Sequence, residues 1–342
     1  MASKTKKLRV AVVGATGLVG REILRLMLDL NFPAGKVLAF ASERSAGSEL
    51  LFGKEVLEVK KLERKALKGK VDLVLASAGK LVSQQLKTWA AEDGYVVVDN
   101  SSAFRMDPTV PLVVPEVNPE EMANHKGYIA NPNCTTIPLT LVLDAVRSTL
   151  GLKEVFVATY QSVSGAGNAA MQELAQQTMS LLTEGTADCE VFPHRIAFNL
   201  IPQIGTPTEN GYTEEEMKVV NECRRILKMP KLHISCTAVR VPVFACHGEA
   251  VQIRTERECS AGELAQILAS KQGLTVLDAP KQFIYPMPIN AVEAMDTMVG
   301  RIRKHPSLPC TFDLWLVADN LWKGAALNAV QIAGAMAESG LL

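Results

Sequence analysis

The sequence predicts an α/β domain built on a mostly parallel sheet, followed by an α+β domain with a partly antiparallel sheet. The chain has 342 residues, about two domains at roughly 150 residues each. Residues 1–131 alternate short β-branched runs with helical patterns, which indicates βαβ units. Residues 132–320 place long helical patterns ahead of consecutive strand-like runs, which indicates helices covering a mixed sheet.

The first domain begins with a mostly apolar segment at residues 8–13, which predicts a buried strand. Apolar residues then follow at helical spacing, which predicts the buried face of a helix. They are Ile23, Leu26, Met27 and Leu30. The other elements expected in this domain are strands at 37–41, 71–76 and 95–99 and a helix at 80–93.

The second domain shows longer helical patterns between its strand-like runs. Its expected elements are a helix at 139–149, a strand at 155–161, a helix at 168–183, strands at 232–242, 249–255 and 314–317, and a closing helix at 323–339. The closing helix is rich in alanine, which suits close packing against a neighbour.

Composition excludes several classes of protein. Lys and Arg total 36, as do Asp and Glu, and aromatic residues are 5%, so a nucleic-acid coat protein is not expected. Seven scattered cysteines without a CxxC pair predict free thiols in a reducing cytoplasm and no metal site. The basic-then-apolar segment 4–13 imitates a signal peptide but is followed by glycines, and no run reaches the roughly 18 apolar residues that span a membrane.

A glycine-rich loop follows the first strand and opens the first helix. It reads Gly14-Ala-Thr-Gly17-Leu-Val-Gly20, and in this position backbone N–H groups and the helix dipole hold a pyrophosphate. The sequence therefore predicts a Rossmann-type nucleotide-binding domain. The spacing is GxxGxxG rather than GxGxxG, so a tight turn without a ligand is the alternative.

The residues after the second strand distinguish the two nicotinamide cofactors. An acidic residue here usually binds the ribose of NAD, whereas the 2′-phosphate of NADP needs cations and hydroxyls. Arg44, Ser42 and Ser45 favour NADP, and Glu43 favours NAD. The balance predicts NADP.

Cys134 stands just before the helix at 139–149, where unpaired backbone N–H groups stabilise a thiolate and an oxyanion. The alternative for any single cysteine is a small buried core residue. A nucleophilic thiolate needs a proton-transfer partner. Among five histidines, His247 is the candidate because it follows an apolar run at a strand end.

Several sequence blocks occur together in an order typical of one family. Over nearly its whole length the chain resembles aspartate-semialdehyde dehydrogenase. The blocks are GATGLVG (14–20), SERSAG (42–47), DNSSAFR (99–105), NPNCTT (131–136), YQSVSGAG (160–167), FNLIPQIG (198–205), NGYTEEEMK (210–218), VRVPVFACH (239–247) and ADNLWKGAALNAVQIA (318–333).

The resemblance implies a role for each matching residue. Cys134 would form a thioester, His247 would be the acid/base and Gln161 would orient the reacting centre. The implied substrate-binding residues are Arg240 for the carboxylate, Glu215 for the amino group, Lys218 near substrate and phosphate, and Arg105 and Asn133 for phosphate. The implied cofactor-binding residues are Gly14, Thr16, Gly17, Leu18, Val19, Ser42, Arg44, Ser45, Ser164, Gly165 and Asn320.

The resemblance also implies the reaction and the assembly. The reaction is NADP-dependent, reversible reductive dephosphorylation of 4-aspartyl phosphate, which supplies lysine, diaminopimelate, threonine, methionine and isoleucine biosynthesis. The second domain would resemble the C-terminal domain of glyceraldehyde-3-phosphate dehydrogenase and form a homodimer or tetramer. Residues 321–342 would pack back on domain 1–131, leaving 132–320 as the catalytic domain.

Alternatives stay open. Taken singly, Glu215 and Lys218 fit a solvated helix pair, residues 164–167 fit a turn, and Arg105 fits a surface cation. Another acyl-phosphate reductase, such as the N-acetyl-glutamyl-phosphate reductase type, or a non-catalytic paralogue shares the architecture. Many relatives have Gly and Ser in place of Cys246 and Gly248, so this chain departs from the pattern beside His247.

The neutral total charge conceals an uneven distribution. We expect one positive cleft that faces three anionic groups, namely a 2′-phosphate, the transferred phosphate and a carboxylate. Its cations would be Arg44, Arg105, Lys218 and Arg240.

Overall fold

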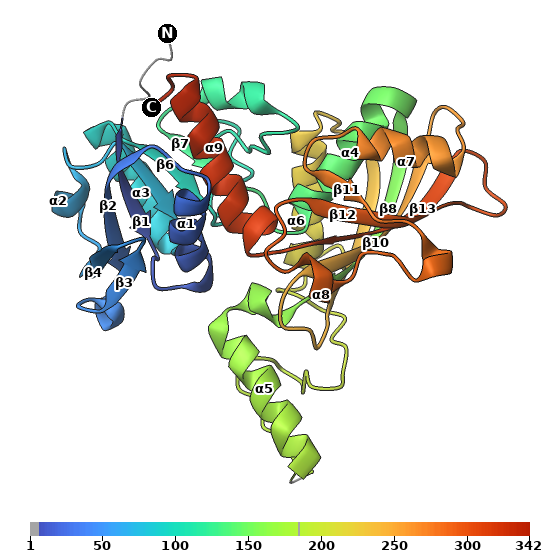
Figure 1. Cartoon of the computed structure of the whole chain (residues 1–342), viewed down its shortest axis with the longest axis horizontal. Coiled ribbons are helices and arrows are strands. Elements are labelled where there is room, and N and C mark those ends of the chain that lie inside the picture. The colour runs from blue at the N-terminus through green and yellow to red at the C-terminus, as the bar shows by residue number, and fades with distance from the viewer. Residues whose placement is uncertain (1–6, 184) are drawn as a thin grey trace. The chain divides into compact units, whose positions relative to one another are not determined.

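The computed structural model describes residues 7–183 and 185–342 (Figure 1). Its contacts divide the chain into two units. Unit 1 comprises residues 1–133 and 325–342, and unit 2 comprises residues 134–324. Residues 4–6 of the basic segment that imitates a signal peptide lie outside the described residues. In the part of the chain that is described, no helix is both long and apolar enough to cross a membrane.

Unit 1 contains a seven-stranded sheet in its described residues, in the order β3-β4-β2-β1-β5-β6-β7. All neighbours are parallel except β3 and β4, which confirms the predicted α/β class. The strands are β1 (Leu8–Val13), β2 (Ala34–Ala41), β3 (Glu49–Phe52), β4 (Glu55–Lys61), β5 (Leu73–Ala76), β6 (Val96–Asp99) and β7 (Tyr128–Ala130). The helices are α1 (Leu18–Asp29), α2 (Arg64–Leu67), α3 (Lys80–Asp93) and α9 (Leu327–Glu338), with short 3-10 turns η1 (Glu43–Ser45) and η2 (Pro119–Asn124).

The helix α1 packs its apolar face on the sheet, as the spacing of its residues predicts. Ile23, Leu26 and Met27 are buried. Leu30 was expected on the same face, and that prediction is wrong, because the helix ends at Asp29 and Leu30 is 37% exposed. The closing helix α9 packs on α1, β5 and β6 within unit 1.

Unit 2 contains a six-stranded mixed sheet among its described residues, in the order β11-β12-β13-β10-β8-β9. The strand β10 runs antiparallel to both β8 and β13, whereas β8 and β9 are parallel, so the predicted partly antiparallel sheet is confirmed. The strands are β8 (Leu152–Gln161), β9 (His233–Arg240), β10 (His247–Thr255), β11 (Leu274–Val276), β12 (Thr297–Lys304) and β13 (Thr311–Ala318). The helices are α4 (Thr136–Leu150), α5 (Asn168–Thr183), α6 (Glu214–Ile226), α7 (Ala261–Ala269) and α8 (Pro288–Ala291), with 3-10 turns η3 (Val163–Ala166) and η4 (Pro280–Gln282) and a π-helical turn η5 (Trp322–Ala326) that crosses into unit 1.

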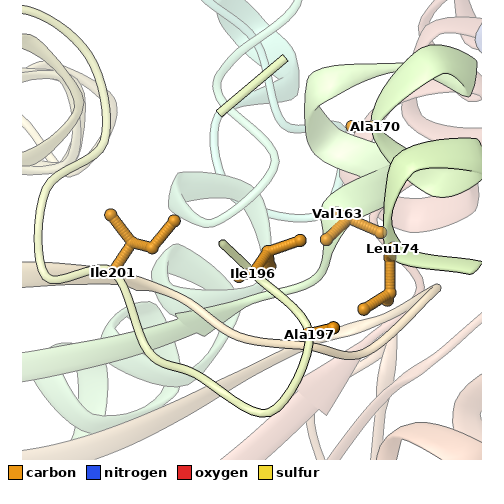
Figure 2. Close-up of a cluster of buried hydrophobic side chains, with 6 residues drawn as sticks. All are labelled: Val163, Ala170, Leu174, Ile196, Ala197 and Ile201. Atoms are coloured by element: carbon orange, nitrogen blue, oxygen red, sulfur yellow. The ribbon is translucent and has the colours of Figure 1, made fainter. Parts of the chain in front are cut away.

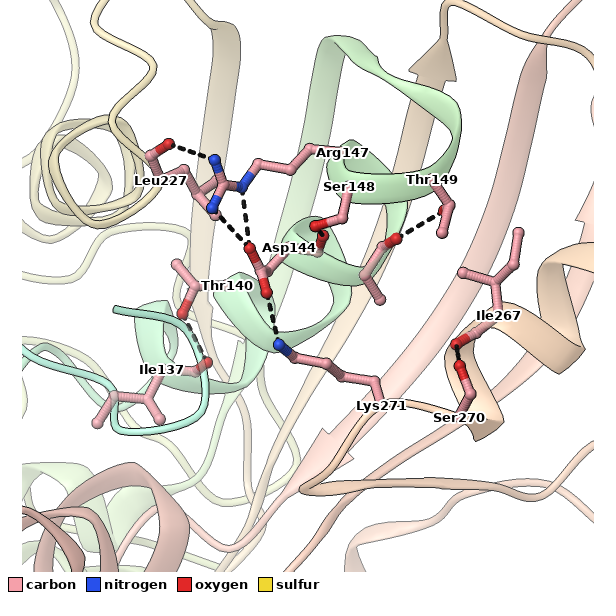
Figure 3. A network of polar contacts seen from close by, with 11 residues as sticks. Ile137, Thr140, Asp144, Arg147, Ser148, Thr149, Leu227, Ile267, Ser270 and Lys271 are labelled. Carbon is pink, nitrogen blue, oxygen red and sulfur yellow. Dashed lines mark hydrogen bonds and ion pairs between the residues drawn. The ribbon is translucent and has the colours of Figure 1, made fainter. Parts of the chain in front are cut away.

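The helices α4, α6 and α7 cover one face of the unit 2 sheet (Figure 1). A polar network ties α4 to its neighbours (Figure 3). The Asp144 carboxylate on α4 accepts hydrogen bonds from Arg147, one turn later, and from Lys271, which follows α7. Arg147 also donates to the carbonyl oxygen of Leu227, at the end of α6. One buried acid therefore joins three segments that cover the sheet.

The other face of this sheet carries aromatic side chains. Phe156 and Tyr160 on β8 are 50% and 37% exposed, and Trp315 on β13 packs against Tyr160. A Cβ atom on Gly248 of β10 would lie only 2.5 Å from the Trp315 ring. The indole therefore occupies the space above a strand position that has no side chain.

The base of α5 is attached to unit 2 by its own small core (Figure 2). Val163, Leu174 and Ile196 belong to this buried cluster. On α5, the Glu173 carboxylate accepts backbone N–H groups from the segment 190–192. This segment is thereby held beside Arg240, against whose guanidinium Phe192 lies.

Candidate active site

Three strand ends of unit 2 meet at one edge of the sheet. Gln161, the last residue of β8, pairs in register with Arg240, the last residue of β9. His247 begins the antiparallel strand β10, beside the end of β8. All three side chains are buried and face the side covered by helices, so the fold gathers residues that lie 86 positions apart.

Cys134 lies two residues before α4, in the short turn that leads into this helix. It is partly exposed, whereas Cys223, Cys236 and Cys246 are buried and burial raises the pKa of each of these three thiols. The described structure shows no side-chain cap on the first turn of α4. Its N–H groups therefore remain directed toward the residues that precede the helix.

Gly324 packs directly on the cysteine. A Cβ atom at this position would lie 2.9 Å from Cys134 Cβ and 3.1 Å from its carbonyl oxygen. A side chain at 324 would displace the cysteine backbone, so this glycine is required for the close approach. Nothing in the sequence distinguishes Gly324, because a glycine in an alanine-rich segment gives no signal of its own.

His247 is 2% exposed, and its two ring nitrogens have different environments. Nδ1 accepts a hydrogen bond from the Ser162 backbone N–H at 3.1 Å. Nε2 is buried without a hydrogen-bond partner among residues 7–183 and 185–342. Burial and the nearby Arg240 guanidinium lower the His247 pKa to about 3, so the ring is neutral at physiological pH.

Arg240 is 7% exposed and donates from Nη1 to the carbonyl oxygen of Ser162 at 2.7 Å. Burial lowers its pKa, and the nearby Cys134 and Glu215 oppose that effect. The pKa of a guanidinium lies so far above neutrality that it stays charged. A buried cation beside the cysteine is suited to bind a carboxylate or to stabilise a thiolate.

Glu215 and Lys218 lie on the first turns of α6, with 2.9 Å between the ammonium and a carboxylate oxygen. Glu215 is 6% exposed and accepts a hydrogen bond from Gln161 Nε2 at 3.4 Å. The pair is therefore partly buried at the site rather than a solvated helix pair. A capping box between Thr213 and Glu216 fixes the start of α6, and Glu216 also accepts the Ala238 N–H of β9.

The loop after β8 brings Ser162, Ser164 and Gly165 to the same place. A Cβ atom on Gly165 would lie 3.1 Å from Arg240 Nη1 and 3.3 Å from His247 Nε2. Asn320 lies behind the loop, where its amide group hydrogen-bonds both serine hydroxyls and the Cys246 N–H. Cys246 has a φ of +69°, the left-handed region that favours glycine, so the departure beside His247 places a strained residue there.

The glycine loop of unit 1 is a tight turn between β1 and α1 in which two positions have no room for a side chain. Gly14 has a φ of +82°, and a Cβ atom there would lie 2.1 Å from the Ser77 carbonyl oxygen. A Cβ atom on Gly20 would lie 2.1 Å from the Gly14 carbonyl oxygen. Thr16, Gly17, Leu18 and Val19 lie between them, at the N-terminus of α1.

The loop after β2 contains the residues expected to distinguish NADP from NAD. Arg44 and Ser42 are exposed and Ser45 is half-buried, in or next to the turn η1. Glu43, which favours NAD, forms an ion pair with Lys61 at 3.0 Å. The charge of Glu43 is therefore partly compensated by the last residue of β4.

The residues expected to bind phosphate are buried in unit 1. Arg105 donates to the Asn100 carbonyl oxygen at 2.7 Å, and Asn133 is 6% exposed. The single positive cleft stays a prediction, because Arg44 and Arg105 belong to unit 1 and Lys218 and Arg240 to unit 2. No group of three or more His, Cys, Asp or Glu side chains in the described residues is arranged to hold a metal ion.

Comparison with known proteins gives a consistent result for both units. The model of the semialdehyde dehydrogenase NAD binding domain matches residues 9–125, and the model of the semialdehyde dehydrogenase dimerisation domain matches residues 143–323. Aspartate-semialdehyde dehydrogenase of Bacillus subtilis is 44% identical over 98% of this chain and 99% of its own length. The aspartate-semialdehyde dehydrogenase of Aquifex aeolicus is 46% identical over 98% of this chain and 99% of its own length.

A solved structure resembles the whole chain. Aspartate semialdehyde dehydrogenase II from Vibrio cholerae, described as complexed with ASA, is 40% identical, with a TM-score of 0.94 over 97% of this chain and 99% of that one. These matches cover both units and the ordered motifs. The chain belongs to the aspartate-semialdehyde dehydrogenase family of oxidoreductases.

Proposed function

We propose that this chain catalyses the reversible, NADP-dependent reductive dephosphorylation of 4-aspartyl phosphate to L-aspartate 4-semialdehyde through a thioester on Cys134. The observation that supports this best is the grouping of a partly exposed thiol at the N-terminus of α4 with a buried cation and a neutral histidine. The family includes enzymes named for the semialdehyde. The product would serve lysine, diaminopimelate, threonine, methionine and isoleucine biosynthesis.

The proposed first half of the reaction builds the thioester. The Cys134 thiolate attacks the acyl carbon of the acyl phosphate, the bond between this carbon and the phosphate oxygen breaks, and the departing phosphate is bound by Arg105 with Asn133. The N–H groups at the start of α4 stabilise the oxyanion, as helix N-termini do. A thioester accepts hydride more readily than a carboxylate, so one difficult step becomes two easier ones.

The substrate would be held by charges that complement its own. Arg240 pairs with the α-carboxylate through its guanidinium fork, and Glu215 accepts the α-ammonium group. Lys218 neutralises Glu215 in the free protein and turns to the phosphate when substrate binds. Gln161 donates from Nε2 toward Glu215 in the free protein, and we propose that it orients the acyl group in the complex.

Several residues would hold the cofactor. The pyrophosphate would lie on Gly14, Thr16, Gly17, Leu18 and Val19, where the close contacts of Gly14 leave no room for a side chain. Arg44, Ser42 and Ser45 would bind the 2′-phosphate, and Ser164, Gly165 and Asn320 would lie near the nicotinamide. When bound in its reduced form, the nicotinamide supplies a hydride.

We also propose that the chain forms at least a homodimer through the aromatic face of the unit 2 sheet. The match to a dimerisation domain supports assembly through this unit. Phe156 is half exposed on the sheet face opposite α4, α6 and α7, so a second copy would bury it.

The proposed reaction is tested by following phosphate-dependent NADPH formation from the semialdehyde. Cys134→Ser should reduce activity at least 10³-fold, an order-of-magnitude expectation for loss of a covalent nucleophile. The exposed Cys189 offers a matched control, and Cys189→Ser should retain wild-type activity. Substantial activity in the Cys134 variant would refute the thioester mechanism.

A further inference from the structure

The strands β2 and β4 end side by side in the unit 1 sheet. They run parallel, and Ala41, the last residue of β2, pairs in register with Lys61, the last residue of β4. On the other side of β2 lies β1, which leads into the glycine loop. Ligands of open α/β sheets bind at the carboxyl ends of the strands, so Lys61 stands at the edge of the sheet where we expect the adenosine half of the cofactor.

The loop between β2 and β3, residues 42–48, is fastened to β4. The Gly47 N–H donates to the Val59 carbonyl oxygen at 2.8 Å, and the Val59 N–H donates to the Ser48 carbonyl oxygen at 2.8 Å. Within the loop, the Ser48 hydroxyl donates to the Ser45 carbonyl oxygen at 2.7 Å. These bonds fix the loop relative to the end of β4, so a side chain on β4 can act on the loop residues.

Two adjacent lysines at the end of β4 have different partners. Successive side chains of a strand point to opposite faces of the sheet, so Lys61 shares the face of the buried Val59 and Lys60 lies on the other face. The Lys60 ammonium lies 3.6 Å from the Glu58 carboxylate on its own strand. The Lys61 ammonium lies 3.0 Å from the Glu43 carboxylate in the loop. Lys61 therefore links β4 to the acidic residue of the loop, and Lys60 does not.

The ion pair bears on the choice between the two nicotinamide cofactors. The Glu43 side chain is 81% exposed, and among the residues that the structure describes its ion-pair partner is Lys61. Arg44, the next residue, has no ion-pair partner in that part of the chain, so its guanidinium can bind an anion. An unpaired carboxylate here would accept a hydrogen bond from the ribose 2′-hydroxyl of NAD. It would repel the 2′-phosphate of NADP, which carries about two negative charges.

We propose that Lys61 is a specificity-determining residue for NADP. Its ammonium holds the Glu43 carboxylate at the end of β4, away from the ribose 2′-hydroxyl that this carboxylate would otherwise bind in NAD. It also offsets the charge that would repel a 2′-phosphate, and Arg44 is left to bind that phosphate. The inference rests on the proposed function, because it explains how a loop with an acidic residue prefers NADP.

Direct binding to the complete enzyme tests this inference without substrate. Titrations that follow nicotinamide fluorescence give the Kd of NADPH and the Kd of NADH separately. In Lys61→Ala the released Glu43 should lower the Kd of NADH about threefold, as expected for one new hydrogen bond at an exposed site, and its uncompensated charge should raise the Kd of NADPH about threefold. Lys61→Arg keeps the ion pair and should keep both wild-type values. If the Kd of NADH in Lys61→Ala stays at the wild-type value, the proposal is wrong.

A second pair of variants asks whether Lys61 acts through Glu43. In Glu43→Ala there is no carboxylate to release, so adding Lys61→Ala should leave the Kd of NADH within about 1.5-fold of that of Glu43→Ala alone. A gain in NADH affinity as large as in the wild-type background would show that Lys61 acts independently of Glu43, and it would overturn the proposal.

Lys60→Ala is the matched control, because it removes the same charge one residue away on the opposite face of β4. It should keep both wild-type Kd values, and a shift like that of Lys61→Ala would mean that the local charge, not the pair with Glu43, sets the preference. A wild-type enzyme that binds NADPH and NADH equally would refute the NADP assignment together with this proposal. If the wild type prefers NADPH but lacks activity on the semialdehyde, the proposed reaction fails, whereas the titrations still decide the role of Lys61.

Discussion

At the scale of single residues, burial acts in opposite directions on two side chains of β10. His247 and Glu249 are two residues apart and face the same side of the sheet. Burial lowers the His247 pKa and raises that of Glu249 well above its ordinary value. Both oxygens of Glu249 are buried without a hydrogen-bond partner in the described part of the chain, so its carboxyl group is neutral in the folded protein.

This state makes stability depend on pH. Because the Glu249 pKa is higher in the folded than in the unfolded chain, its contribution is complete below about pH 4.3 and is lost as the pH rises, by roughly 1.4 kcal/mol per unit. Glu249→Gln has no proton to lose. The free energy of unfolding of this variant, measured by denaturant titration at pH 5 and pH 8, should fall less between the two than that of wild type.

His247 also makes stability depend on pH, but in the opposite direction: its pKa is lowered in the folded protein, so its contribution is lost as the pH falls toward 3. This contribution is the same in the variant and in the wild type, so the difference between their slopes reports on Glu249. Glu154→Gln, at a partly exposed position on β8, is the control and should keep the wild-type slope. Identical slopes for wild type and the Glu249 variant would show that Glu249 ionises inside the fold.

Arg240 gives a second test at this scale. Arg240→Lys keeps the positive charge and loses the fork that grips a carboxylate, so KM for the semialdehyde should rise about tenfold, or 1.4 kcal/mol, with a smaller change in kcat. Steady-state kinetics measures both. Arg254→Lys, on an exposed ion pair of β10, should leave KM unchanged. If KM for the Arg240 variant stays at the wild-type value, another group binds the carboxylate.

At the scale of elements, the helix that presents Cys134 is held by its polar network as well as by its apolar face. Asp144 is 6% exposed and contacts Arg147 and Lys271 (Figure 3). Asp144→Asn should lower the free energy of unfolding by about 2 kcal/mol, because two partly buried cations lose their partner. Glu154→Gln removes an exposed ion pair and should cost less than about 0.5 kcal/mol. If both variants lost the same free energy of unfolding, the Asp144 network would contribute no more than an exposed ion pair.

The loop after β2 is the element that should set cofactor preference. Arg44→Ala removes the exposed cation expected at the 2′-phosphate, so the ratio of kcat/KM for NADP to that for NAD should fall at least tenfold. Lys60→Ala removes a nearby exposed cation and should leave the ratio unchanged. An unaltered ratio in the Arg44 variant would assign the 2′-phosphate to other residues.

Elements with strong hydrophobic periodicity were predictable from the sequence, and short or highly charged elements were not. The strand β1 and the helices α3 and α5 agree with their predicted bounds because long apolar periods and strand-helix alternation define them. The strands β3 and β4 were not predicted, because β3 has only four residues and four of the seven residues of β4 are charged. The Ser162 contact to His247 is similarly invisible, because it joins positions 85 apart.

At the scale of the whole molecule, each unit completes a different half of the proposed chemistry. Unit 1 holds the glycine loop and Arg44, and unit 2 holds Cys134, His247 and Arg240. The family and the two-domain class followed from the ordered motifs. The aromatic face of the unit 2 sheet could not be predicted, because the sequence alone does not show which face of each strand α4, α6 and α7 cover.

That face gives a prediction for assembly. Phe156→Asp places a charge on the exposed aromatic surface, so a dimer formed there should dissociate to a monomer of 37.0 kDa in size-exclusion chromatography with light scattering. Leu81→Asp, an exposed apolar position on α3 of unit 1, should keep the wild-type mass. A Phe156 variant with unchanged mass would place the interface elsewhere.

The packing of Trp315 over Gly248 restricts which side chains this neighbourhood can hold. A side chain at 248 cannot be accepted while the indole lies 2.5 Å from the Cβ position, whereas a smaller residue at 315 leaves only a cavity. A side chain at 248 therefore requires either that the indole shifts or that residue 315 is smaller. The side chain of a residue on β13 thus determines which residue the strand that begins with His247 can carry at its second position.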